Sequence, residues 1–255
     1  MTKASILIQN NLYEFYDQLA QTGGLALEKG HQWSALKNES GYWPGAIYRF
    51  GSSIISPDKA AGFTEKVTSG KLPDFLVAED EGIEQTSPFL QKLGFHPFAA
   101  WKGMWLEQYN VQPVSFPDLV IIEKITCNED LEQWIKIVST ELLNSATIEK
   151  SLLKKLIIHP SFDAYLLKNN GIGVSSVMVF KSEESFGLYL IATDKSAQKK
   201  GFGRILINAV LTRLAAEAKK PVILQATSAG EILYTKLGFV PVNRFFLFRY
   251  LKNRT

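Results

Sequence analysis

The sequence predicts an α+β fold built on a mixed β-sheet, and three features of residues 118–255 lead to this prediction. The expected elements run in the order strand, two helices, three strands, helix, strand, helix, strand. The Asn-Asn-Gly turn at residues 169–171 favours an antiparallel hairpin between two of the consecutive strands. The later strand–helix–strand step predicts a right-handed parallel crossover, so both strand directions occur in one sheet.

Each element has a local signal. Residues 119–122 form an apolar run typical of a strand. A first helix is expected after this strand, and a second helix at residues 147–158. The core face of the first helix is expected to consist of Leu131, Ile135, Val138 and Leu142. The further strands are expected at residues 162–167, 174–180, 188–193, 222–226 and 244–251. A long helix is expected at residues 203–218 and a short one ends at Leu237.

A short repeat indicates that the fold is duplicated. Residues 92–97 (KLGFHP) recur as residues 236–241 (KLGFVP), and an apolar run precedes each copy. The glycine of each copy suits the left-handed position after a helix. We therefore expect two domains, residues 1–117 and residues 118–255. The helices before the two glycines are expected to begin at the N-caps Ser87, followed by Pro88, and Ser228, in a capping box with Glu231.

Composition limits the function classes. Hydrophobic residues make up 46% of the 255 residues, and the net charge of +3 is too small and too scattered to indicate nucleic-acid binding. No apolar window is long enough to span a membrane. The single cysteine, Cys127, allows no intramolecular disulfide, which fits the cytoplasm. The three histidines do not cluster at metal-ligand spacing, so no metal site is expected.

The segment that indicates chemistry lies at residues 191–204, between a strand and the long helix. Gly201 and Gly203 allow the backbone to approach an anion, and the helix N-terminus supplies unpaired N–H groups. Lys199, Lys200 and Arg204 add positive charge, so the segment suits a pyrophosphate. It matches neither a P-loop nor a dinucleotide fingerprint, because the required Lys-Ser/Thr and third glycine are absent.

The pattern Gln198-x-x-Gly201-x-Gly203 resembles the pyrophosphate loop of the GCN5-related N-acetyltransferase (GNAT) superfamily. Residues 233–239 (LYTKLGF) resemble that superfamily's second signature. The resemblance covers residues 118–255. It implies the acyl-CoA N-acyltransferase fold for this half. The first half resembles a degenerate copy, which makes the protein a tandem one.

The resemblance also implies residue roles. The backbone of residues 191–193 is expected to pair with the pantetheine arm, and the strand at Val222 to splay from the strand at Leu188. Tyr234 corresponds to a general acid that protonates the leaving thiolate. Thr227 stands where the family commonly has asparagine. The residues expected to bind acetyl-CoA are Ile191, Ala192, Thr193, Gln198, Lys199, Lys200, Gly201, Phe202, Gly203, Arg204 and Thr227.

The first half lacks this pattern. Leu90 stands at the position of Tyr234, and no comparable glycine loop precedes the apolar run at residues 75–78. This half is therefore expected to form a wall of the acceptor site. Trp33, Trp43, Trp101 and Trp105 either line that site or pack in the core. Glu183 and Glu184 either act as the base or form an ordinary surface loop.

The sequence thus predicts an N-acetyltransferase. An amine of a small molecule or peptide attacks acetyl-CoA directly in a ternary complex, without a metal and without nucleic acid or membrane partners. The alternative is a non-catalytic acyl-CoA-binding module for regulation or interaction. The acceptor, the preferred acyl chain length, the base and the oligomeric state remain open.

Overall fold

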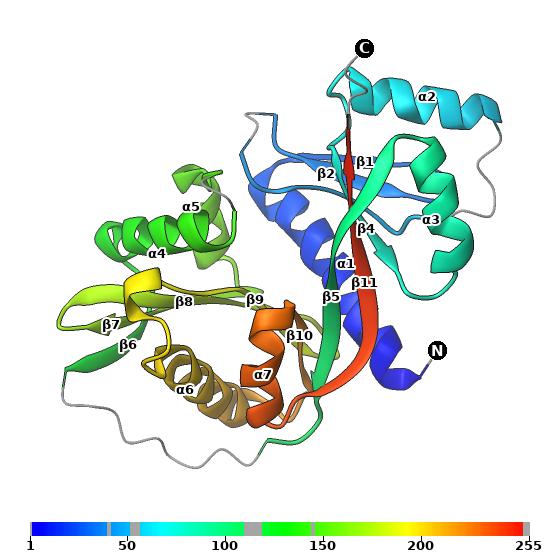
Figure 1. Cartoon of the computed structure of the whole chain (residues 1–255). Helices are drawn as coiled ribbons and strands as arrows, with labels where there is room; N and C mark the ends of the chain where they lie inside the picture. The colour runs from blue at the N-terminus through cyan, green and yellow to red at the C-terminus, as the bar shows by residue number, and fades with distance from the viewer. Residues whose placement is uncertain (1, 40–41, 52–56, 110–118, 144–145, 252–255) are drawn as a thin grey trace.

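The computed structural model describes residues 2–39, 42–51, 57–109, 119–143 and 146–251. Its strands form one eleven-stranded mixed sheet in the order β1-β2-β3-β4-β11-β5-β10-β9-β8-β7-β6 (Figure 1). The mixed α+β class is thereby confirmed. The expected boundary between residues 117 and 118 falls in the segment 110–118, outside the described residues.

The first half of the chain contributes three helices and five strands to the part that is described. These elements are α1 (Lys3–Gly23), β1 (Ala26–Lys29), β2 (Ser34–Lys37), β3 (Gly45–Tyr48), α2 (Pro57–Thr68), β4 (Phe75–Glu79), α3 (Ile83–Lys92) and β5 (Phe95–Leu106). β3 and β4 run parallel, and the other neighbouring strands within this half run antiparallel.

The second half has the expected order of elements. They are β6 (Val120–Lys124), α4 (Asn128–Glu141), α5 (Lys150–Ile158), β7 (Phe162–Asn169), β8 (Ile172–Lys181), β9 (Phe186–Thr193), the 3₁₀ turn η1 (Lys195–Ala197), α6 (Phe202–Glu217), β10 (Val222–Ala226), α7 (Ser228–Lys236) and β11 (Val240–Tyr250). β9 precedes α6 and β10 follows it in the chain, and the two strands run parallel, as predicted for this step.

The last strand of each half pairs with the other half. β11 lies antiparallel beside β4, and β5 lies antiparallel beside β10. β5 and β11 pair with each other along most of their length and form the centre of the sheet (Figure 1). Residues 26–106 and 120–250 are therefore joined by backbone hydrogen bonds, and neither half completes its sheet from its own strands alone.

Hydrophobic cores cover both faces of the sheet. α1 shares one core with α4 and α5, where Phe15, Trp134 and Leu152 are buried together. α6 and α7 pack on the opposite face of the second half, around Leu206 and Val210. α2 and α3 enclose a third core in the first half, which includes Phe63. α1 thus belongs to the first half in sequence but packs against helices of the second.

Three local predictions were wrong. The N-cap of α7 is Thr227, whose side chain accepts the N–H of Gly230, while Ser228 is the first helical residue. α3 begins at Ile83 after the left-handed Gly82, so Pro88 lies inside this helix instead of at its start. Leu142 is 40% exposed because α4 ends at Glu141, and Trp134 and Ile137 complete its buried face instead.

Candidate active site

The parallel strands β9 and β10 part at one end of the sheet. Their paired residues end at Leu188 and Leu224, although β9 continues to Thr193 and β10 to Ala226. The splay expected from the sequence is therefore present. Because the pairing stops there, the β10-facing edge of β9 offers backbone groups to a ligand between the strands.

A bulge in β9 marks the point of separation. Between the pairs Ser176–Ala192 and Met178–Tyr189, β9 contains one residue more than β8. Leu190 has a φ of 49°, a left-handed conformation that costs energy for a non-glycine residue. Bulges of this kind often lie beside functional sites, where they redirect the backbone.

Two buried serines of β8 support the bulge. Ser175 Oγ donates to the carbonyl of Ala192 at 2.8 Å, and Ser176 Oγ lies 3.3 Å from the carbonyl of Leu190. Ser175 Oγ also lies 2.9 Å from Thr193 Oγ1. Sequence reasoning missed both serines. The available signal was an adjacent polar pair within the otherwise apolar run of residues 174–180.

Residues 194–201 join β9 to the N-terminus of α6, and together with Gly203 they are called the glycine loop. Gly201 is the N-cap of α6 with a φ of 85°, and the first N–H groups of the helix, at Phe202, Gly203 and Arg204, have no acceptor within the helix. A Cβ on Gly203 would lie 3.3 Å from Thr193 Oγ1, so glycine permits the close contact between helix and strand. The Phe202 side chain packs into the core, which leaves its backbone as the group available to a ligand.

Polar side chains hold this loop in place. Gln198 Nε2 donates to the carbonyl of Thr193 at 3.0 Å and to Glu141 Oε2 at 3.2 Å. Glu141 Oε1 also accepts the N–H of Lys195. Gln198 therefore shapes the loop with its side chain. Glu141, at the end of α4, is a second residue that sequence reasoning missed.

The positive charge expected around the loop is at the surface. Lys199, Lys200 and Arg204 are all exposed, and Lys199 has a φ of 62°. Asp194 caps the preceding turn, and its hydrogen bonds from Ser196 hold the pKa of its carboxyl below the ordinary value. The loop therefore presents three exposed cations to solvent next to the first N–H groups of α6.

Tyr234 lies on α7 and lines a pocket between the parted strands. Its ring is only 7% exposed and packs edge-on against Phe239. Gly230 makes this position possible, since a Cβ there would lie 2.9 Å from the Tyr234 ring. Burial raises the pKa of the Tyr234 phenol above its ordinary value, so the hydroxyl stays protonated at neutral pH. Thr227 lines the same pocket and caps α7.

The pocket has a volume of about 240 Å³ and takes its walls from both halves. The second half contributes β9, β10, α7 and the residues after α4. The first half contributes Leu12, Phe15, Tyr16, Trp43 and Trp101. The walls contributed by the first half are therefore mainly apolar and aromatic.

Gln225 on β10 is the most informative polar group of the pocket. Its amide nitrogen is buried and makes no hydrogen bond of ordinary geometry within the described parts of the chain, although the hydroxyl of Tyr189 lies near it. A buried amide N–H without a well-formed hydrogen bond is costly, so this group is available to an acceptor on a ligand. Nothing in the sequence distinguished Gln225 from a neutral strand residue.

Asn11 of α1 fixes Tyr189 in the pocket wall. The Tyr189 hydroxyl donates to Asn11 Oδ1 at 2.8 Å, and Asn11 Nδ2 donates to Ser185 Oγ at 2.9 Å. The Tyr189 ring is stacked on Phe15 with ring centroids 3.7 Å apart. The first half therefore orients a side chain of the second half's pocket.

The other residues that the sequence suggested for the acceptor site do not line this pocket. Trp33 packs against Phe63 in the third core, and Trp105 is partly buried against the first. Glu183 and Glu184 are exposed and do not line the pocket. Within the described ranges, no group of histidine, cysteine, aspartate or glutamate side chains is arranged to hold a metal ion. Nor does any helix of those ranges have the length and apolarity needed to cross a membrane.

Comparisons with solved structures extend over both halves. A GCN5-related N-acetyltransferase from Kribbella flavida has a TM-score of 0.67 and 14% identity, with 93% of this chain and 94% of that chain covered. A GCN5-related N-acetyltransferase from Sphaerobacter thermophilus has a TM-score of 0.64 and 12% identity, covering 86% and 76%. A tandem GNAT protein from the clavulanic acid biosynthesis pathway has a TM-score of 0.59 and 13% identity, covering 85% and 77%. At such identities the likeness establishes the fold.

The sequence comparisons concern the second half. No curated protein matches the chain. The family model described as an acetyltransferase (GNAT) domain matches residues 127–252. The recognition made from the two motifs is thereby confirmed, and residues 127–252 of this chain belong to the GNAT family.

Proposed function

We propose that this protein transfers an acetyl group from acetyl-CoA to an amine of a small molecule or peptide. The observation that carries the proposal is the opening between β9 and β10, which has the glycine loop at one end and a largely apolar pocket within it. Membership of residues 127–252 in an acetyltransferase family supports the same reaction class.

The residues present fit coenzyme A. The first N–H groups of α6, with Gly201 and Gly203 before them, suit a pyrophosphate. The buried amide nitrogen of Gln225 makes no well-formed hydrogen bond among the described residues, and a carbonyl oxygen of the ligand would accept one. We assign the backbone of Ile191, Ala192 and Thr193 to the pantetheine arm. Arg204, Lys199 and Lys200 add charge around the phosphates.

In the proposed reaction, the amine nitrogen forms a bond to the thioester carbonyl carbon, and the carbon–sulfur bond breaks. Tyr234 is the proton donor to the departing sulfur, because its raised pKa keeps the hydroxyl protonated and it lies in the pocket wall. Thr227 and Gln225 are proposed to position the thioester. The proton of the amine leaves to water, since Glu183 and Glu184 lie outside the pocket, and Tyr234 regains a proton from water.

We further propose that the two halves, residues 1–117 and residues 118–255, are two copies of one fold, of which only the second binds acetyl-CoA. The first copy acts as a wall of the acceptor pocket through Trp43 and Trp101. This wall favours an acceptor with an apolar or aromatic group next to its amine.

Calorimetric titration with acetyl-CoA tests the site. The parent protein should bind, and Gly203→Glu should weaken binding by about 100-fold or more, because a carboxylate would stand beside the phosphates. Gly62→Glu is the matched control, since Gly62 is exposed on α2, the corresponding helix of the first half. Gly203→Ala tests whether the loop tolerates a Cβ at all.

Thermal unfolding of each variant separates loss of the fold from loss of the site. Absence of acetyl-CoA binding by the folded parent would overturn the proposal. Binding without any release of free thiol, over a panel of aromatic and aliphatic amines, would favour the non-catalytic binding module instead.

A further inference from the structure

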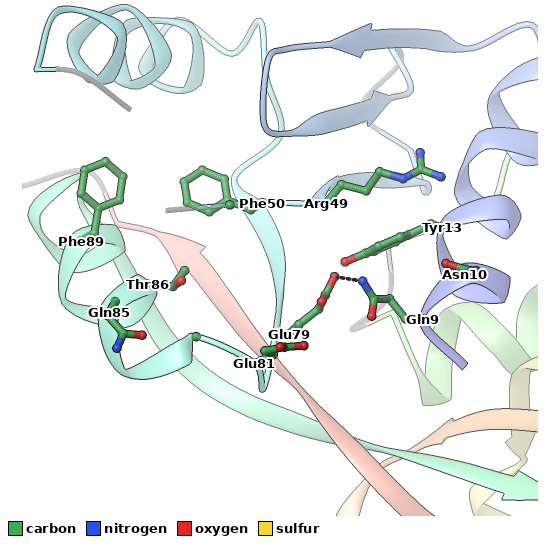
Figure 2. Close-up of a pocket in the computed structure, with 12 residues that line it drawn as sticks. Gln9, Asn10, Tyr13, Arg49, Phe50, Glu79, Glu81, Gln85, Thr86 and Phe89 are labelled. Atoms are coloured by element: carbon green, nitrogen blue, oxygen red, sulfur yellow. Dashed lines mark hydrogen bonds between the residues drawn. The ribbon is translucent and has the colours of Figure 1, made fainter. Parts of the chain in front are cut away.

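The first half contains a groove of about 960 Å³ between α1, the ends of β3 and β4, and α3 (Figure 2). Gln9 and Tyr13 line it from α1, whereas Leu12 and Tyr16 of the same helix line the candidate active site. The two cavities therefore lie on different sides of α1. We call this cavity the first-half groove and define it by Gln9, Tyr13, Phe50, Glu79, Glu81 and Phe89.

The groove contains two carboxylates that form no ion pair with any of the described residues. Gln9 Nε2 donates to Glu79 Oε1 at 2.6 Å, as the dashed line in Figure 2 marks. Within the described ranges, neither Glu79 nor Glu81 takes part in an ion pair. The burial of Glu79 and the nearby Glu81 raise the pKa of the Glu79 carboxyl to about 7.

The neighbouring cations are already paired. Arg49, which also lines the groove, binds Asp17 at 2.7 Å, and its guanidinium lies over the ring of Tyr13. Arg244 of β11 lies 3.6 Å from Asp80. A positively charged ligand would therefore meet the Glu79 carboxylate without having to displace a cation of the protein.

Aromatic rings form the wall opposite the carboxylates. Phe50 and Phe89 stack on each other with centroids 6.4 Å apart, and Figure 2 shows them across the groove from Glu79. Both rings are only partly buried, so apolar surface is available to a ligand. Carboxylates together with aromatic faces are the chemistry that recognises organic ammonium ions.

Phosphate-bearing ligands fit the groove poorly. Glu81 and Glu84 stand at the start of α3 and offset the partial positive charge of that helix end. The groove-lining residues include Arg49, but its charge is engaged by Asp17. The electrostatic preference is therefore the opposite of that of the glycine loop in the second half.

We propose that the first-half groove binds an arylalkylammonium ion, with the ammonium at Glu79 and Glu81 and the aryl group against Phe50 and Phe89. The bound amine lies outside the acyl-transfer pocket and is not acylated there. This site does not depend on the proposed acetyltransferase activity, because no residue of the glycine loop or of the active-site pocket contributes to it.

Titration of the full chain with 2-phenylethylamine tests the proposal, with binding detected by ligand-observed NMR and calorimetry at pH 8. We expect Glu79→Gln to weaken binding about tenfold or more, because the substitution removes the charge and preserves the shape. Glu84→Gln, an exposed glutamate of the same region that does not line the groove, should bind like the parent. Phe50→Leu should weaken binding about threefold through loss of the aromatic face.

Ligands of matched shape test the charge preference. The neutral 2-phenylethanol and the anionic 3-phenylpropionate should each bind about tenfold more weakly than the amine. The affinity for the amine should rise about tenfold between pH 5.5 and pH 8 as Glu79 ionises, with Glu81, Asp80, Asp17, Arg49 and Arg244 as the surrounding charges. Glu79→Gln should abolish that dependence.

Equal affinity of the parent and Glu79→Gln, equal affinity for the alcohol and the amine, or no binding of the amine would each overturn the proposal. Amine bound in the active-site pocket would be insensitive to Glu79→Gln and counts against the groove. Glu79→Gln must leave the affinity for acetyl-CoA unchanged. Failure of the acetyl-CoA titration alone therefore bears on the proposed function and not on this site.

Discussion

The two halves of the chain show how one backbone arrangement can present different chemistry. In each, a parallel strand pair parts after a short pairing, β3 with β4 and β9 with β10. In each, a non-glycine residue with left-handed φ follows, Arg49 at 54° and Leu190 at 49°. The second opening has a glycine loop and Tyr234, while the first has Glu79 and paired Arg49. The fold sets where a cavity occurs, and the side chains set its ligand.

The position of the tyrosine gives the sharpest contrast. Leu90, the residue at the equivalent place in the first repeat, is fully buried in the third core. Tyr234 instead reaches a pocket. The same helix position therefore serves packing in one half and is available for chemistry in the other.

The largest expected effect tests that packing role. Leu90→Ala should lower the free energy of unfolding by about 3 kcal/mol, through lost apolar burial and a residual cavity. Chemical denaturation measures it, with the volume-conserving Leu90→Met as control, expected to cost under about 1.5 kcal/mol. Loss of acyl transfer without loss of stability would mean that the first half acts chemically at this position.

Tyr234→Phe tests the other side of the comparison. We expect kcat to fall about 100-fold, because the proton donor is removed, while the affinity for acetyl-CoA stays unchanged. Steady-state kinetics and calorimetry on one preparation give both quantities. Tyr109→Phe, a partly buried tyrosine outside the pocket, is the control. Unchanged turnover in Tyr234→Phe would remove it from the mechanism.

Asn11→Ala tests whether the halves depend on each other. The substitution leaves the buried Tyr189 hydroxyl and Ser185 without their shared partner, and should cost about 2 kcal/mol. Asn10→Ala, an exposed neighbour on α1, should be close to neutral. Thermal unfolding compares the two. If they destabilise equally, α1 does not organise the pocket through Asn11.

The smallest expected effect is a change in stability caused by Glu79 in the first-half groove. The pKa of Glu79 is raised from 4.5 to about 7 on folding, so the folded state binds more protons between these pH values. Stability linked to Glu79 is therefore present below pH 4.5 and is lost as the pH rises to about 7. The full shift corresponds to about 3 kcal/mol, but Glu79 is only partly buried and solvent screens much of it. Glu79→Gln should therefore stabilise the free protein by about 1 kcal/mol at pH 8 and very little at pH 4. Unfolding curves at both pH values check the sign. A stabilisation independent of pH would contradict the raised pKa.

Much of the fold was predictable because its signals are local. The repeated KLGF segment marks helix ends with glycine, and the structure has left-handed residues at Gly94 and Gly238. Apolar runs and turns placed the strands of the second half within a few residues. The errors at Ser228 and Pro88 arose because nearby residues, Thr227 and Gly82, compete for the cap position, and sequence pattern alone does not decide between them.

The candidate site was predictable only in part. The glycine loop and Tyr234 lie in short motifs and could be identified. Gln225 and Glu141 could not be identified, because Glu141 gains its role from a partner far away in sequence and Gln225 from its buried position in the folded pocket. For Trp43 and Trp101, the sequence left open whether they line the acceptor site or pack in the core.

The sequence by itself determined the order of elements, the left-handed glycines and the loop chemistry, since these depend on neighbouring residues and on backbone sterics. Tertiary structure alone decided the rest. β5 and β11 pair with the opposite halves, and α1 packs beside α4, because burial of apolar surface between distant segments fixes such contacts. That packing places side chains of the first half in the pocket of the second, and it leaves Glu79 in a groove whose arginine, Arg49, is paired with Asp17.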